Sequence, residues 1–118
     1  MSRIGAITLL NQTVTTTVNG TTSPIGTGVE KAALTLTGSA FGGTTPSFTV
    51  AVQHSFDGGT NWLALATFTA MTANGSQTVF VSEDAGTVVI GTSLRAIVSA
   101  ASGTTPTALL VVTATVKD

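Results

Sequence analysis

Charged residues are scarce in this chain. It has four basic and five acidic residues among 118, or 8%, where about 25% is usual for a soluble domain. These residues are Arg3, Glu30, Lys31, Asp57, Glu83, Asp84, Arg95, Lys117 and Asp118. Most fall at the ends of predicted strands, so the strand faces are left to Thr, Ser, Ala and aliphatic side chains. Since so uncharged a surface lets free monomers associate, we expect other protein chains to cover much of it.

Several classes of function are excluded or disfavoured by what is missing. Cysteine is absent, which excludes a disulfide framework and a thiolate metal site. The net charge is −1, without a basic patch or an acidic run, so nothing indicates nucleic-acid binding. No apolar stretch approaches the roughly 18–20 residues of a membrane helix. The apolar run 4–10 is short for a signal peptide and lacks a small-residue cleavage site after it, so we interpret it as a strand.

The hydrophobic pattern that is present has a period of two, which is typical of half-buried strands. Phe48, Val50 and Val52, for example, alternate with more polar neighbours. Predicted strands cover 4–10, 12–18, 29–37, 47–55, 62–69, 76–82, 87–90, 93–100 and 107–117, separated by Gly-rich and Asn-Gly turns. Residues 62–69 are apolar on both faces, which predicts a central strand. No segment has a capped helical pattern.

These elements predict a single all-β domain over residues 1–118. The expected architecture is an antiparallel β-sandwich of about eight strands, with jelly-roll or immunoglobulin-like topology. Residues 19–28 are the most loop-like stretch, so residues 1–28 are expected to form an N-terminal arm or an edge hairpin. Whether this segment folds on its own domain or on a neighbour is left open by the sequence.

A four-residue motif occurs twice. Gly43-Thr44-Thr45-Pro46 returns as Gly103-Thr104-Thr105-Pro106, each copy lying a few residues after a Ser-Ala pair and before another strand. Since proline cannot donate to a strand ladder, each copy is predicted to be the loop before a strand, within two similar hairpins. The alternative is two independent turns that share a Thr- and Gly-rich composition.

Ser55-Phe56-Asp57-Gly58-Gly59-Thr60-Asn61-Trp62 is the most specific local pattern. It resembles the Asp-box of sialidases and related β-propellers, matching at Ser55, Asp57, Gly59 and Trp62. That resemblance implies a structural hairpin turn remote from any chemistry, and a single copy excludes a propeller. From the residues themselves, Asp57 can accept backbone N–H bonds, Gly58 and Gly59 tolerate positive φ, and Trp62 packs across the hairpin. An exposed Trp62 that binds a sugar or a partner is the alternative.

No residue set indicates catalysis, a metal site or a cofactor. His54, the only histidine, lacks the nucleophile, carboxylate or further ligands that such a role needs, so it is expected at the surface or in an interface. The pair Glu83 and Asp84 is expected to be a solvated turn. Arg95 is the one basic residue predicted in mid-strand, and we expect it to pair with Glu30, Glu83, Asp84 or a neighbouring subunit. Arg95 and Trp62 are therefore candidate interface residues.

The order of motifs gives a second resemblance, over about residues 45–117. The turn from Ser55 to Trp62, the strand Leu94-Arg95-Ala96-Ile97-Val98 and the segment Ser102-Gly103-Thr104-Thr105-Pro106 look like those of small β-sandwich structural proteins of tailed bacteriophages. The resemblance is to the capsid decoration, or cement, class. It implies a non-enzymatic virion protein without a cofactor, which binds the capsid surface of an icosahedral shell, contacts the major capsid protein and forms a homo-oligomer, with a trimer favoured.

Two other functions stay open at this point. One is a tail- or fibre-associated β-sandwich subunit, for which the same low charge would be suitable. The other is a carbohydrate-binding or adhesion module with Trp62 as its platform, although one Trp, no Tyr and five Phe leave little stacking surface. Neither alternative involves nucleic acid, a membrane or an enzymatic reaction.

Overall fold

Seven strands and no helix make up the regular structure in the described part of the chain. The computed structural model describes residues 4–26, 29–82 and 90–117. The strands are β1 (Ile4–Val14), β2 (Val18–Asn19), β3 (Ser23–Pro24), β4 (Lys31–Ser55), β5 (Leu63–Thr67), β6 (Gly75–Ser82) and β7 (Ser93–Lys117). There is thus no helix in the described ranges that could cross a membrane.

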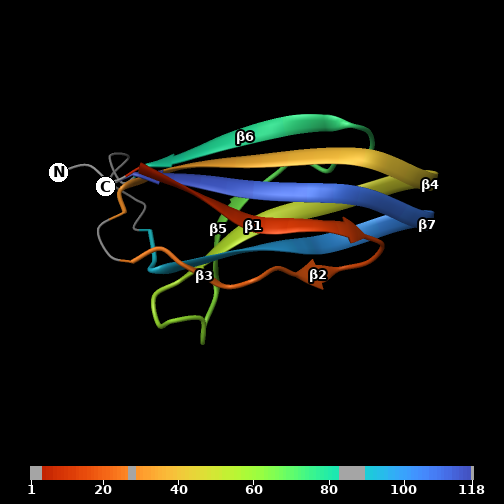
Figure 1. Ribbon diagram of the computed structural model, residues 1–118. Helices are drawn as coiled ribbons and strands as arrows, with labels where there is room; N and C mark the ends of the chain where they lie inside the picture. The colour runs from red at the N-terminus through yellow and green to blue at the C-terminus, as the bar shows by residue number, and fades with distance from the viewer. Residues whose placement is uncertain (1–3, 27–28, 83–89, 118) are drawn as a thin grey trace.

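The two longest strands, β4 and β7, organise the sheet. Each has 25 residues, and they pair antiparallel from Lys31 opposite Lys117 to Ser55 opposite Ser93. The main path of the sheet is β1-β7-β4-β5, with β6 also on β4, and β2 and β3 also on β7. Both long strands turn back on themselves at one end of the molecule, so that one half of the sheet lies over the other (Figure 1).

The all-β, antiparallel prediction is confirmed. The hydrogen bonding describes one open sheet of seven strands rather than two separate sheets, so a jelly-roll or immunoglobulin-like sandwich is not confirmed. The predicted strand 4–10 and residues 12–14 of the predicted strand 12–18 form one strand, β1, which pairs with β7 of the same chain over its length. Val18 belongs to β2. The strand predicted at 62–69 is the shorter β5, and it lies at an edge of the sheet rather than in its centre. Most of the predicted strand 87–90 lies outside the described residues.

Alternate side chains of the long strands fill the core. Successive residues of a strand point to opposite faces, so a period-two sequence turns one apolar face toward the other half of the sheet. The side chains with no exposed surface include Leu34, Leu36, Phe48, Val50, Val52, Leu94, Leu110 and Val112. These residues come from both halves of β4 and β7, which indicates that the core lies between the two halves.

Both Gly-Thr-Thr-Pro copies lie where the long strands bend. The prediction that each is a loop before a strand is wrong, because β4 and β7 continue through them and the copies pair with each other, Thr44 opposite Thr104. Thr45 and Thr105 have positive φ angles of 47° and 46°, and each hydroxyl donates to the carbonyl of the preceding threonine at 2.8 Å. The pairing register shifts around them. An irregular ladder of this kind bends a strand and increases its twist.

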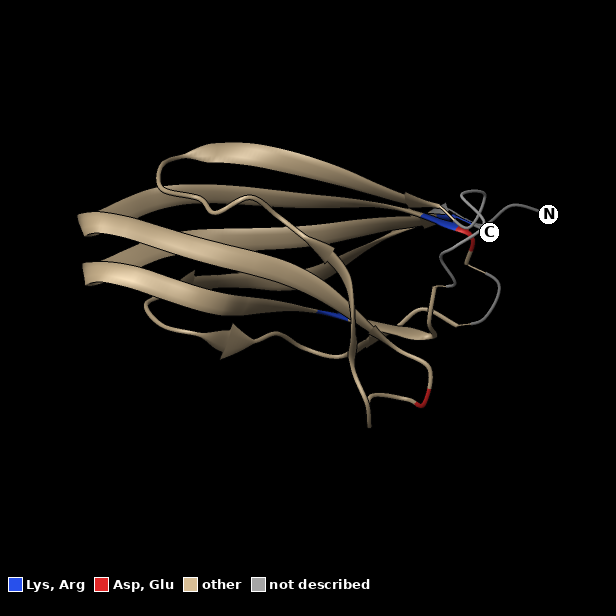
Figure 2. Cartoon of the chain, turned by 180° about the vertical axis from the view of Figure 1, so that it is seen from behind, with Lys and Arg blue, Asp and Glu red and all other residues tan. Residues whose placement is uncertain are grey.

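Charge is distributed unevenly along the molecule. Lys31 lies opposite Lys117, and the Glu30 N–H donates to the Lys117 carbonyl at 2.9 Å, whereas Asp57 lies in the loop after β4. Figure 2 shows positive and negative charge side by side at the end where β4 begins and β7 ends. The segments that form the opposite, bent end, 38–47 and 100–107, contain no charged residue. The outward faces between the two ends therefore present mainly hydroxyls and small apolar groups.

Candidate functional site

The turn after β4 is held by its own side chains. The Ser55 hydroxyl, which has no exposed surface, donates to Asp57 Oδ1 at 2.7 Å and accepts the Gly59 N–H at 2.9 Å. Asp57 accepts the Asn61 backbone N–H at 2.9 Å and the Asn61 side-chain amide at 2.6 Å. Gly58 and Gly59 have positive φ angles of 74° and 102°. The arrangement fixes a turn and leaves no carboxylate oxygen of Asp57 unused.

These hydrogen bonds give the turn a pH dependence. They hold the pKa of Asp57 at about 2, below its usual 3.8, because bonds to the charged form favour it. The folded chain therefore keeps this carboxylate charged where the unfolded chain protonates it. Stability contributed by Asp57 is fully present above pH 3.8 and is lost as the pH falls through about 2. Thermal melts of wild type between pH 4 and 2 should fall more steeply than those of Asp57→Asn. Parallel curves would contradict this role.

Arg95 lies over the ring of Trp62. Its Cζ atom is 4.4 Å from the ring centroid, and its Nε donates to Gln53 Oε1 at 2.8 Å. Among the described residues, Arg95 therefore contacts Trp62 and Gln53, and not the carboxylate that we expected. Glu83 and Asp84 lie outside the described residues. The pairing register explains the contact, because Gln53 is directly opposite Arg95 on the neighbouring strand. Trp62 and Arg95 do come together, and Arg95 covers one face of the ring.

Removal of Arg95 should expose the tryptophan. We expect Arg95→Ala to shift Trp62 fluorescence to longer wavelength and to cost about 1–2 kcal/mol, from one cation–π contact and one hydrogen bond. Arg95→Lys, which keeps the charge but lacks the planar guanidinium group, should give an intermediate shift. Trp62 is the only tryptophan, so its emission reports on this contact alone. An unchanged spectrum in Arg95→Ala would show that the ring is covered by something else.

His54 is buried rather than at the surface. It is 7% exposed, its Nδ1 accepts the Gly91 N–H at 3.0 Å, and its ring packs 4.9 Å from that of Phe56. Burial lowers the pKa of His54, because the charged form would lose water. The sequence held a signal for this, since His54 is in phase with the buried Val50 and Val52. His54 acts here as a neutral hydrogen-bond acceptor within the structure.

Candidate metal ligands do not cluster in the described part of the chain. No group of three or more His, Cys, Asp or Glu side chains lies close enough there to hold a metal ion. The described residues also show no buried side-chain polar atom without a hydrogen-bond partner.

One exposed face was not singled out by the sequence. Phe80 in β6 is 78% exposed and is the most exposed large apolar side chain of the described residues. It lies opposite Ala33 of β4, which is in turn opposite Thr115 of β7. Beside Phe80 these small residues leave a largely apolar groove of about 310 Å³, with Lys31 and Lys117 at its margin. The exposure of Phe80 could have been predicted from strand alternation, because Phe80 lies on the same face of β6 as the polar residues Thr78 and Ser82.

The next row of the same face consists of threonines. Thr78, Thr35, Thr113 and Thr8 lie side by side on β6, β4, β7 and β1. The hydroxyls of Thr35 and Thr78 are hydrogen bonded at 3.2 Å. Thr–Thr pairs across neighbouring strands stabilise a sheet. The face around Phe80 is therefore regular, with its charged groups confined to the margin near the termini.

Comparisons with known proteins give one structural likeness. No protein-family model and no curated protein matches this sequence. The chain is similar to the crystal structure of the PBSX exported protein XepA, with a TM-score of 0.60 and 14% sequence identity. The match covers 95% of this chain but only 36% of XepA, so the chain spans about a third of that protein's length. At this level of identity the likeness is one of fold.

Proposed function

We propose that this protein is a non-enzymatic structural protein of a bacteriophage particle. Its specific role would be to decorate the capsid surface as a cement protein bound to the major capsid protein. The observation that carries the proposal is the outer face of β6, β4, β7 and β1, on which charge is confined to Lys31 and Lys117 at the margin and Phe80 is 78% exposed. An exposed apolar patch bordered by polar residues marks a contact site, and Phe80 with the apolar groove beside it forms such a patch.

The structural likeness supports a phage origin. XepA is named as an exported protein of PBSX, and the fold match covers nearly the whole of this chain. It bears on the kind of particle and not on the capsid role, which rests on the surface and on the resemblance of residues 45–117. A sugar-binding platform on Trp62 is disfavoured, because Arg95 covers one face of its ring.

The mechanism would be burial of surface, repeated by symmetry. Each contact between hydroxyl and small apolar groups is weak, but many identical contacts on one shell act together. Few charges are available for salt to screen. Binding to the shell should therefore change little between low and high ionic strength.

A binding experiment tests this role directly. Shells assembled without this protein, and separately purified tails of the same phage, are incubated with the purified chain and sedimented at 50 and 500 mM salt. Binding to shells at both salt concentrations, with greater resistance of the shells to heat, is expected. Binding to tails alone would replace the capsid role with a tail role. Binding to neither would overturn the proposal that it is a virion protein.

A further inference from the structure

In the described part of the chain β6 is an edge strand, and its sequence lacks the usual protection of such a strand. Among the described strands it pairs with β4 alone, and all eight of its residues pair in an unbroken register. Its sequence, Gly-Ser-Gln-Thr-Val-Phe-Val-Ser, contains no charge and no proline. Natural proteins protect exposed edges with charges, prolines, bulges or very short strands, since an open edge is a template for another chain. None of these features occurs within β6 itself.

The sequence of β6 reads almost the same in both directions. Around Phe80 it is Thr78-Val79-Phe80-Val81-Ser82. If two copies of this strand pair antiparallel about Phe80, each Val79 lies opposite Val81 of the second copy and each Thr78 opposite Ser82. The hydroxyls then share one face with the aromatic rings and the valines share the other. Like is matched with like at every position, which points to a second copy of this chain as the occupant of the edge.

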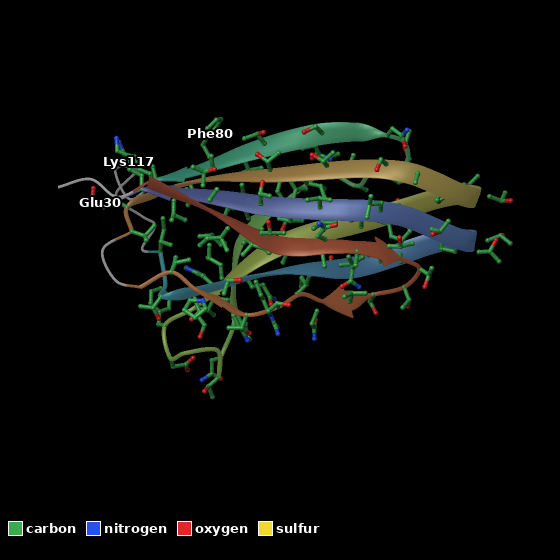
Figure 3. The ribbon with its side chains drawn as sticks, viewed as in Figure 1. Glu30, Phe80 and Lys117 are labelled. Carbon is green, nitrogen blue, oxygen red and sulfur yellow. The ribbon has the colours of Figure 1, made fainter. Side chains whose placement is uncertain are left out.

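The exposure of the side chains agrees with that pairing. Phe80 is 78% exposed whereas its neighbour Val81 is 8% exposed, so the apolar surface left to cover lies on the outer face. The side chain of Phe80 extends outward from β6, near the end that carries Lys117 (Figure 3). In the antiparallel pair the two Phe80 rings would lie directly opposite each other. Directly opposed aromatic residues stabilise a strand pair.

We propose that two copies of this protein join through β6, antiparallel and centred on Phe80, to make one continuous sheet. The proposal rests on the proposed function in that it names the surface through which the virion protein assembles with itself. Such a contact uses the same patch on both subunits and closes after two copies. It therefore gives a dimer rather than the trimer that the resemblance to decoration proteins implies.

Cysteine cross-linking tests the pairing, since the chain has no cysteine of its own. Opposite residues of an antiparallel pair have Cα atoms about 4.5–5.5 Å apart, within the range that a disulfide spans. Under mild oxidation Phe80→Cys should give a band at twice the 11.7 kDa monomer mass. Leu63→Cys is the control, since Leu63 is 56% exposed but lies in β5. A cross-link in Leu63→Cys but not in Phe80→Cys would overturn the proposal.

A second pair of variants keeps Phe80 in place. Thr78→Cys and Ser82→Cys should cross-link when they are mixed but not when each is alone. Residues 78 of the two copies would be about 13 Å apart along the strand, at about 3.3 Å per residue. If no cross-link forms in the mixture or in either single variant, the proposed pairing of two β6 strands is wrong. If the β6 strands do not cross-link but the protein still sediments with shells, the β6 pairing is wrong and the proposed function stands. If the protein cross-links through β6 but binds no particle, the pairing stands and the proposed function is wrong.

Discussion

Gly43→Ala is expected to destabilise this protein more than any other single exchange of glycine for alanine at the bend. A Cβ atom at Gly43 would come within 2.3 Å of the Thr105 carbonyl oxygen and 2.6 Å of the Thr104 oxygen. These are backbone atoms of the paired copy, so they can move only if the crossing of β4 and β7 is disrupted. Gly43 also has a φ of 89°. Strain and overpacking together should cost about 3–5 kcal/mol.

Gly58→Ala is the matched control. Gly58 also has a positive φ, of 74°, but a Cβ atom there meets nothing within 4 Å. The free energy of unfolding of Gly58→Ala should fall by only about 1–2 kcal/mol, the cost of the left-handed backbone conformation for alanine. The difference between the two variants in urea unfolding then measures the close approach of the strands at the bend. Equal losses would show that the two Gly-Thr-Thr-Pro copies do not pack as tightly as the structure has them.

Phe48→Ala should produce the second large loss, about 3–5 kcal/mol. Phe48 has no exposed surface, its ring meets that of Phe41 edge-on at 6.1 Å, and its backbone exchanges two hydrogen bonds with Met71. The ring thus fills the core just beyond the bend, where the two halves of the sheet meet. Its removal leaves a cavity that backbone paired on both sides cannot collapse to fill.

The control for this variant is Phe56→Ala. Phe56 is 51% exposed and touches only the His54 ring among the aromatic residues described. It should lose about 1 kcal/mol or less, since much of its surface is already in water. Chemical unfolding of both variants compares the same deletion inside and outside the core. Similar losses for the two would place the core elsewhere than between the two halves.

The parts of the fold that the sequence predicts are those that depend on local pattern. Alternation places Val50, Val52 and their neighbours on an inward face, and the strand predicted at 76–82 agrees with β6 to within one residue. The Asp57 turn could also be derived, because its hydrogen bonds join residues within four positions of each other. Local spacing is enough where the partners are local.

The continuity of β4 and β7 could not be predicted in this way. Gly, Thr and Pro are found both in loops that end a strand and at bends where a strand continues, so these residues do not distinguish the two structures. The difference is decided by pairing between Thr44 and Thr104, which are 60 positions apart. The partner of Arg95 was missed for the same reason, since only the strand register places Gln53 opposite it.

The central claim is that this chain has so little surface charge because other chains cover it. The most direct test is the solution mass of the purified protein, measured by light scattering over a concentration series in low and high salt. The account predicts a species of twice the 11.7 kDa chain mass that persists in high salt, since apolar and main-chain contacts hold it. A monomer at the highest concentrations in both buffers would contradict it.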